Sequence, residues 1–135
     1  MVKKSIRAAV DRSKFISYKI VAENFYNGAK IASEYNYYNA AGVLIVHAAI
    51  AFADAVTIKY NGTKSKGDDH REVITLLEEI LPSNEERKKS INHLDAIIVH
   101  KNAVSYSGDV YNKKDIEQLW KHLERFKSWA ITFLK

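Results

Sequence analysis

Proline and glycine, the residues that most often interrupt regular secondary structure, are scarce in this chain. Its 135 residues include a single proline, Pro82, and five glycines. Because the many turns of a β fold draw on these residues, their scarcity favours a few long helices joined by short connections. The chain has no cysteine, which excludes disulfides, thiolate zinc sites and cysteine nucleophiles.

Apolar residues recur at helical spacing in four long segments. In residues 15–34 they alternate steps of three and four, and the stripe continues across Asn27-Gly28, which we therefore interpret as a weak point inside a helix. Residues 37–60 are apolar around most of the circumference and are expected to form the central helix. The same rhythm predicts a helix from Pro82 to about Gly108 and a last helix that runs to the C-terminus.

Pairs of polar residues three positions apart mark three helix starts. The side chain of the first residue and the acid three residues later can cap the first turn of a helix. The stretch at residues 61–67 is expected to be a mobile basic loop, and the short helix after it to end near Leu81. The sequence thus predicts an all-α, up-and-down four-helix bundle with one short accessory helix, forming a single domain over residues 1–135. The capping pairs are Asp69 with Glu72, Ser83 with Glu86, and Asn112 with Asp115.

The charge balance is moderately basic. Lysine and arginine total 21 against 16 acidic residues, for a net charge of +5, which favours anionic partners without requiring them. The basic N-terminus lacks the apolar core of a signal peptide, and the longest apolar stretch, residues 40–56, contains His47 and Asp54 and is shorter than the ~20 residues of a membrane span. We expect a soluble, cytoplasmic protein that does not enter a membrane.

Motifs for cofactors and metals are not evident. The glycines are too dispersed for a phosphate-binding loop or a dinucleotide fingerprint, and the five histidines include no pair at i, i+4. The acidic run Asp68-Asp69-His70-Arg71-Glu72 is better explained by helix capping than by a cation site, which needs more converging oxygens. We therefore expect no cofactor and no bound metal.

His47 and Asp54 interrupt the most apolar helix. They are seven residues apart and so lie on one face, and a buried charge there costs several kcal/mol unless it is paired. Asp54 either pairs with a lysine of a neighbouring helix, or lies at the wet edge of the bundle, or forms with His47 the polar floor of a site. We favour a structural role, because satisfied polar groups in cores outnumber catalytic ones.

Three stretches resemble the HEPN family of small helical bundles. Residues 100–111, with the sequence HKNAVSYSGDVY, followed by residues 114–130, resemble the C-terminal half of these domains. Residues 37–62 resemble the alanine-rich second helix of the family, and residues 67–77 its short linker helix that opens near a histidine. The similarity spans roughly residues 15–134, and it implies a helical bundle.

In ribonuclease members of the family, an arginine, a polar residue and a histidine form the cutting site, usually across a homodimer. Here the resemblance places Lys101, Asn102 and Tyr106 at these positions. Tyrosine ionises near pH 10 and exchanges protons poorly at neutral pH, while lysine keeps the charge but loses the planar fork that holds a phosphate. The anion-holding part is thus retained and the acid–base part lost. His100 is adjacent to Lys101, but neighbouring helical residues point about 100° apart.

Our main hypothesis is a non-catalytic HEPN-like module for binding and dimerisation. Lys101, Asn102 and Tyr106 would line a groove at a two-fold interface, with Asp54 and His47 behind them. The resemblance implies a homodimer, a nucleotidyltransferase-family protein partner, and a nucleotide or RNA as ligand. The alternative is a metal-independent endoribonuclease of the toxin type, in which Lys101 stabilises the developing charge and Tyr106 or His100 moves the proton. A structural bundle without a ligand is the third possibility.

Structural interpretations of the same residues stay open at this point. Lys101 can be the partner of Asp54, and Tyr106 can pack on Trp120 or Trp129. The tyrosines between the first two helices can stack on bases, although filling the end of the bundle is the commoner role of such residues. These tyrosines are Tyr35, Tyr37 and Tyr38.

Overall fold

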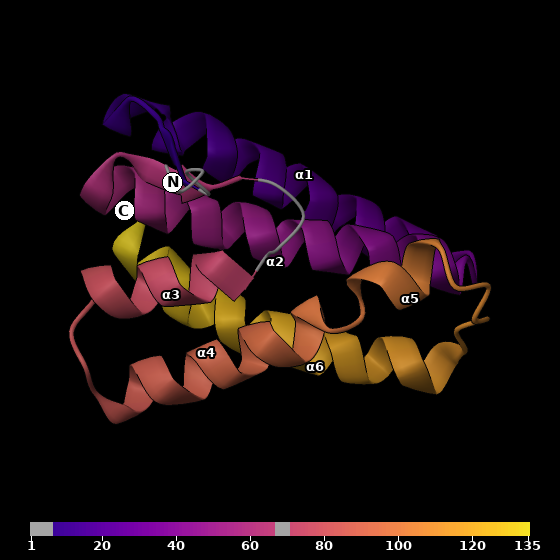
Figure 1. Ribbon diagram of the computed structural model, residues 1–135. Coiled ribbons are helices and arrows are strands. Elements are labelled where there is room, and N and C mark those ends of the chain that lie inside the picture. The colour runs from indigo at the N-terminus through magenta and orange to yellow at the C-terminus, as the bar shows by residue number, and fades with distance from the viewer. Residues whose placement is uncertain (1–6, 67–70) are drawn as a thin grey trace, which may run out of the picture.

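The computed structural model describes residues 7–66 and 71–135, which form a helical bundle (Figure 1). The four long helices are α1 (Phe15–Glu34), α2 (Tyr38–Asn61), α4 (Glu85–Ile98) and α6 (Lys113–Ala130). Two short helices, α3 (Arg71–Ile80) and α5 (Lys101–Ser105), and two 3₁₀ turns, η1 (Arg12–Lys14) and η2 (Ile131–Phe133), complete the helical part. The predicted all-α bundle is confirmed, with two short helices where one was expected.

Helix α2 occupies the centre of the bundle, as its composition predicts. Its alanine-rich surface lets α1 pack along one side, while α3, α4 and α6 cover the others. By length and composition α2 could cross a membrane, so the expectation that its apolar stretch is too short was wrong. However, 83% of the apolar window is buried by the rest of the protein, as in the core helix of a bundle.

Helix α1 runs without interruption through Asn27 and Gly28, which confirms that this dipeptide is not a turn. One core residue of α1 lies outside the predicted apolar stripe, which consists of Phe15, Tyr18, Ala22, Phe25, Ala29 and Ala32. Tyr26 is buried, its ring meets that of Trp120 edge-on at 5.1 Å, and its hydroxyl donates to the carboxylate of Glu124 on α6.

Helix starts agree with the capping predictions in one case and differ in another. Asn112 and Asp115 form the predicted capping box of α6. Helix α4 begins one residue later than expected, because Asn84 rather than Ser83 is the N-cap and accepts a 2.8 Å hydrogen bond from the backbone of Arg87. Both side chains are good caps, so composition alone does not choose between them. The cap predicted at Asp69 lies outside the described residues.

The predicted basic loop contains a short strand, so that expectation was wrong. Strand β2 (Thr63–Ser65) pairs antiparallel with β1 (Arg7–Ala9), with Arg7 opposite Ser65. Arg7 also reaches α3, where its guanidinium donates to Glu72 at 2.6 Å and to Glu79 at 2.9 Å. These contacts join segments more than fifty residues apart, which local sequence patterns do not reveal.

Candidate functional site

Helix α5, which carries the predicted site, is a separate element docked on α2. The helix predicted to reach Gly108 ends at Ile98, and after a turn the chain resumes as α5. Val104 of α5 is buried against Gly42 of α2, where an added Cβ would lie 2.8 Å from a Val104 methyl group. The glycine therefore permits the close approach of the two helices.

The side chain of Asn39 fixes α5 and the loop that follows it. Its amide donates to the carbonyl of Val104 at 3.1 Å and to that of Asp109 at 2.9 Å, and its carbonyl accepts from the backbone of Tyr111 at 2.8 Å. These bonds hold the residues around the motif against the first turn of α2.

The three motif residues divide between two sides of α5. Lys101 lies three residues before the buried Val104 and is itself half-buried, so it is on the side that meets α2. Asn102 and Tyr106 are exposed, and because they are four residues apart they share the outer side. Tyr106 is 82% exposed. The outer face of α5 therefore offers an amide and a phenol, while the ammonium of Lys101 is directed toward α2.

The imidazole that interacts with Lys101 comes from α2. His47 is packed against Phe25, with ring centroids 5.7 Å apart. Its pKa is lowered by burial and, to a smaller extent, by the positive charge of Lys101. The alternative pairing of Lys101 with Asp54 was wrong, since the salt bridges within the described part of the chain are those of Arg7.

His100 is held by a different neighbour. Its Nδ1 lies 2.6 Å from the hydroxyl of Tyr111, and the two rings meet edge-on with centroids 5.7 Å apart. Because Nδ1 is engaged with Tyr111, this side of the ring is not available to a ligand beside Lys101.

Asp54 is deeply buried and lies two helical turns from His47. It is 6% exposed, and its Oδ1 has no hydrogen-bond partner within the described residues. Burial raises the pKa of Asp54 to about 7, against a smaller lowering by Lys64, which is on a strand and not on a neighbouring helix. Seven residues of helix rise by about 10 Å, so Asp54 does not share one floor with His47.

Two of the three tyrosines between α1 and α2 are exposed at the α5 end of the bundle. Tyr35 and Tyr37, between α1 and α2, are 69% and 67% exposed, so the expectation that they fill the bundle end was wrong. Of this group Tyr38 is half-buried, and its hydroxyl donates to Asn36. The Asn39 hydrogen bonds bring the turn that carries Tyr37 next to the loop that follows Tyr106.

The tryptophans are engaged elsewhere, which rules out the packing proposed for Tyr106. Trp120 packs against Tyr26 and donates to Ser33 at 3.2 Å. The ring of Trp129 lies between those of Phe126 and Phe133, at 5.9 and 5.1 Å.

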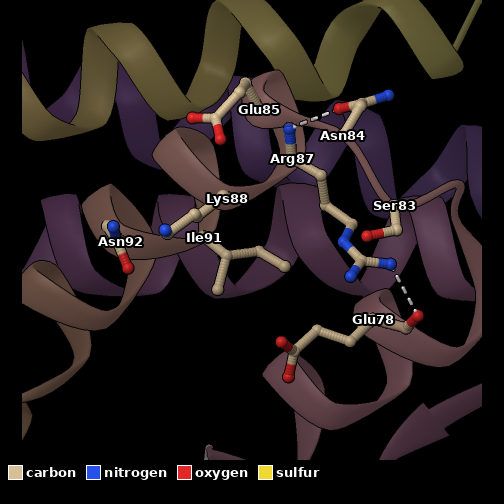
Figure 2. Close-up of a pocket in the computed structure, with 8 residues that line it drawn as sticks. All are labelled: Glu78, Ser83, Asn84, Glu85, Arg87, Lys88, Ile91 and Asn92. Carbon is tan, nitrogen blue, oxygen red and sulfur yellow. Dashed lines mark hydrogen bonds between the residues drawn. The ribbon is translucent and has the colours of Figure 1, made fainter.

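One cavity, of about 550 Å³, lies where α3 meets α4 (Figure 2). Figure 2 shows the guanidinium of Arg87 reaching across to the backbone of Glu78, and this side chain also donates to the carbonyl of Leu81, both at 2.8 Å. Arg87 thus donates to the last carbonyls of α3, and its guanidinium stabilises the turn between α3 and α4. Lys101, Asn102 and Tyr106 are not among the residues that line this cavity.

Sequence reasoning missed a pair of histidines that face each other across two helices. Nδ1 of His93 on α4 lies 2.9 Å from Nδ1 of His122 on α6. The spacing of histidines along the sequence does not reveal this contact, because His93 and His122 are 29 residues apart. Within residues 7–66 and 71–135 no group of three or more histidine, aspartate or glutamate side chains is arranged to hold a metal. The predicted capping and metal interpretations of Asp68, Asp69 and His70 lie outside these residues.

Comparison with known proteins agrees with the resemblance and with the fold. Neither the curated proteins nor the solved structures include a significant match. The sequence does match the HEPN domain over residues 18–133, which is most of the 135-residue chain. Taken with the helical bundle, this match shows that the chain belongs to the HEPN domain family, whose members are nucleotide-binding or ribonuclease-type modules.

Proposed function

We propose that this chain is a non-catalytic HEPN module that binds single-stranded RNA at the α5 end of the bundle. The observation that carries the proposal is the outer face of α5, where Asn102 and Tyr106 are exposed and a tyrosine stands at the motif position that resembles the family's histidine. Tyr37 and Tyr35 extend this face with two more exposed rings. Stacking on such rings contributes about 1–3 kcal/mol per base and requires no particular sequence.

The charges at this end support an RNA ligand. Lys113 and Lys114, at the start of α6, are exposed and follow the loop that Asn39 holds. Lysines beside stacking rings contact the phosphates and make binding salt-dependent. This combination of rings and cations is typical of surfaces for single-stranded nucleic acid.

Fluorescence anisotropy with a labelled single-stranded RNA tests this proposal. We expect Tyr106→Ala and Tyr37→Ala each to weaken binding by about five-fold or more, given the stacking energies above. Tyr60→Ala is the matched control, because Tyr60 is a partly exposed tyrosine at the opposite end of α2. Equal losses in all three variants, or binding that does not weaken as salt rises, would contradict the proposal.

The proposed assembly is a homodimer with a nucleotidyltransferase-family protein as a further partner, and membership of the HEPN family is what supports it. Sedimentation at micromolar concentration tests the first part, where a monomer at all concentrations would exclude the dimer. Co-expression with a small nucleotidyltransferase encoded nearby, followed by affinity purification, tests the second. We expect the two chains to be retained together.

One observation favours a second candidate, a metal-independent endoribonuclease. Lys101 acts electrostatically on His47, so an ammonium and an imidazole whose pKa is lowered occur in one region. In this version His47 accepts a proton from the 2′-hydroxyl of the RNA, whose oxygen attacks the adjacent phosphate, and Lys101 stabilises the charge that develops there. The bond from phosphorus to the 5′-oxygen breaks, and that oxygen takes a proton from water, leaving a cyclic phosphate. Incubation with RNA in EDTA tests it, with His47→Ala and Lys101→Ala expected to abolish cleavage and His100→Ala to retain it. Intact RNA with the wild-type protein would exclude this candidate.

A further inference from the structure

A second groove lies between the first half of α4 and the last half of α6, at the opposite end of the bundle from α5 (Figure 1). Its volume is about 420 Å³, within the roughly 300–1,000 Å³ of small-molecule sites. Its lining comes from four residues of α4, three of α6 and one of η2: Glu86, Lys89, Ser90 and His93; Arg125, Ser128 and Trp129; and Thr132.

The helical spacing explains why these residues share one groove. On α4, Glu86, Ser90 and His93 follow at steps of four and three, and on α6 Arg125 and Trp129 are four apart. Such spacings place side chains on one face of each helix. The two faces meet along the α4–α6 contact, so the groove is built by regular helices and not by loops.

The groove is positively charged, and its cations are not engaged. Lys89 and Arg125 are exposed, and within the described part of the chain neither makes a hydrogen bond or an ion pair. Arg87, by contrast, is held by two backbone carbonyls. Among the described residues, Glu86 is the one acidic side chain that lines the groove. Two unengaged cations against one carboxylate favour an anionic ligand.

Ser90 adds a hydrogen-bonding group at the floor. It is a buried polar residue, and its hydroxyl forms no hydrogen bond with any described residue. Its Oγ is not among the fully enclosed side-chain atoms that lack a partner within the described residues, so it is reachable and can donate to a ligand oxygen.

The paired imidazoles lie at one end of the groove. The Nδ1 atoms of His93 and His122 are 2.9 Å apart, so one ring donates to the other and the accepting ring is unprotonated at Nδ1. Burial lowers the pKa of both, and nearby positive groups add to the effect: His122 and Arg125 act on His93, while Arg125, His100 and Lys121 act on His122. An anion bound beside them would offset this positive potential.

Trp129 supplies a flat apolar wall. The ring is half-buried and contacts the rings of Phe126 and Phe133 at interplanar angles of 51° and 75°. An indole fixed in this way can stack with another flat ring. The hydroxyl of Thr132 donates to the carbonyl of Trp129 at 2.6 Å, so it supports the wall.

We propose that this groove binds a small phosphate ester that carries a flat ring. The phosphate lies between Lys89 and Arg125 and accepts from Ser90, while the ring stacks on Trp129. Arginine suits a phosphate because its planar fork donates two parallel hydrogen bonds. The site is independent of the α5 face, since Lys113 and Trp129 are sixteen residues apart on α6, a rise of about 24 Å.

Tryptophan fluorescence tests the proposal directly. The chain has two tryptophans, so in a Trp120→Phe background the signal reports Trp129 alone. We expect phenyl phosphate to change this signal with a saturable dependence, and to bind more tightly than inorganic phosphate. Phenol at the same concentrations is expected to produce no saturable change. If phenyl phosphate and inorganic phosphate bind equally, the stacking part of the proposal is wrong.

Charge variants distinguish binding in this groove from nonspecific electrostatic attraction to the protein surface. Arg125→Met and Lys89→Met should each weaken binding about ten-fold, the cost of one charge-assisted hydrogen bond. Lys88→Met is the matched control, because Lys88 is adjacent to Lys89 in the sequence but lines the cavity of Figure 2. The affinity of this variant for phenyl phosphate should stay within two-fold of wild type. Equal losses for Lys88→Met and Lys89→Met would overturn the proposal.

A third readout monitors the imidazole pair in the folded protein. Bound phosphate should raise the titration midpoints of His93 and His122 in NMR spectra, since the anion stabilises their protonated forms. Midpoints that stay unchanged at saturating phenyl phosphate would place the anion outside the groove. Circular dichroism of each variant confirms that a lost signal does not reflect unfolding.

Discussion

Replacing Asp54 with asparagine should make the protein more stable at neutral and alkaline pH. Asp54 is buried in the central helix, and its Oδ1 has no hydrogen-bond partner within the described residues. The neutral carboxyl is therefore tolerated there better than the carboxylate, whose burial without a partner is costly. Asparagine has nearly the shape of the neutral acid and cannot ionise.

The size of the effect follows from the pKa of Asp54. Burial raises it from 3.8 to about 7 in the folded protein. Between these values the folded state binds more protons than the unfolded chain, so the free energy of unfolding falls as the pH rises. A difference of about three pKa units corresponds to at most about 4 kcal/mol. This loss begins near pH 4 and is complete above pH 7.

Urea unfolding followed by circular dichroism between pH 4.5 and pH 8.5 measures the effect. The quantity to compare is the difference between wild type and Asp54→Asn, because the lowered pKa values of His47, His93 and His122 act in both proteins and cancel. We expect a small difference at pH 4.5 that grows, in favour of the variant, up to pH 8. Glu117→Gln, an exposed change on α6, should show no such trend.

Two results would refute this reasoning. A difference that stays constant with pH would mean that Asp54 does not titrate in this range. A variant less stable than wild type at pH 8 would mean that the carboxylate is stabilised in the folded state, for instance by Lys64, whose charge already lowers its pKa.

Three further substitutions test how the site is positioned. Asn39→Ala should lower the free energy of unfolding by about 2–4 kcal/mol, since it leaves three backbone groups without their partner. Amide hydrogen exchange should accelerate around Val104, and unchanged protection there would show that Asn39 does not hold α5. Gly42→Ala should displace α5, because the new Cβ meets Val104 at 2.8 Å, and amide NMR shifts confined to α2 would argue against it. Asn112→Ala removes the capping box shared with Asp115 and should cost about 1 kcal/mol in urea unfolding, so an unchanged midpoint would show that the cap is dispensable.

The helices that could be predicted from sequence are those whose signal is local. A three–four rhythm identified α1, α2 and α6 and most of their buried residues, and the Asn112–Asp115 box identified the start of α6. These features depend on neighbours within one or two turns. The pairing of β1 with β2 joins residues 7–9 to residues 63–65, and no local pattern predicts such a contact.

The break between α4 and α5 was missed because its cause is tertiary. The close approach at Gly42 and the Asn39 hydrogen bonds hold α5 on α2, and neither can be anticipated without knowing that the two segments meet. The pairing of His93 with His122 was missed for the same reason.

The predicted site residues remain a prediction, and their arrangement was not evident from the sequence. The charge of Lys101 lowers the pKa of His47, whereas Asp54 is buried two helical turns away from His47. The separation of Lys101 from Tyr106 was within reach of the sequence, since residues five apart on a helix point about 140° apart.

The central claim is that the α5 end of this HEPN domain holds RNA without cutting it. The most direct test is to saturate the wild-type protein with single-stranded RNA in EDTA, recover the RNA from the complex and measure its mass. We expect RNA of full length after prolonged incubation, and binding weakened by about five-fold or more in Tyr106→Ala. Shortened fragments that disappear in Lys101→Ala would contradict it and identify the protein as a ribonuclease.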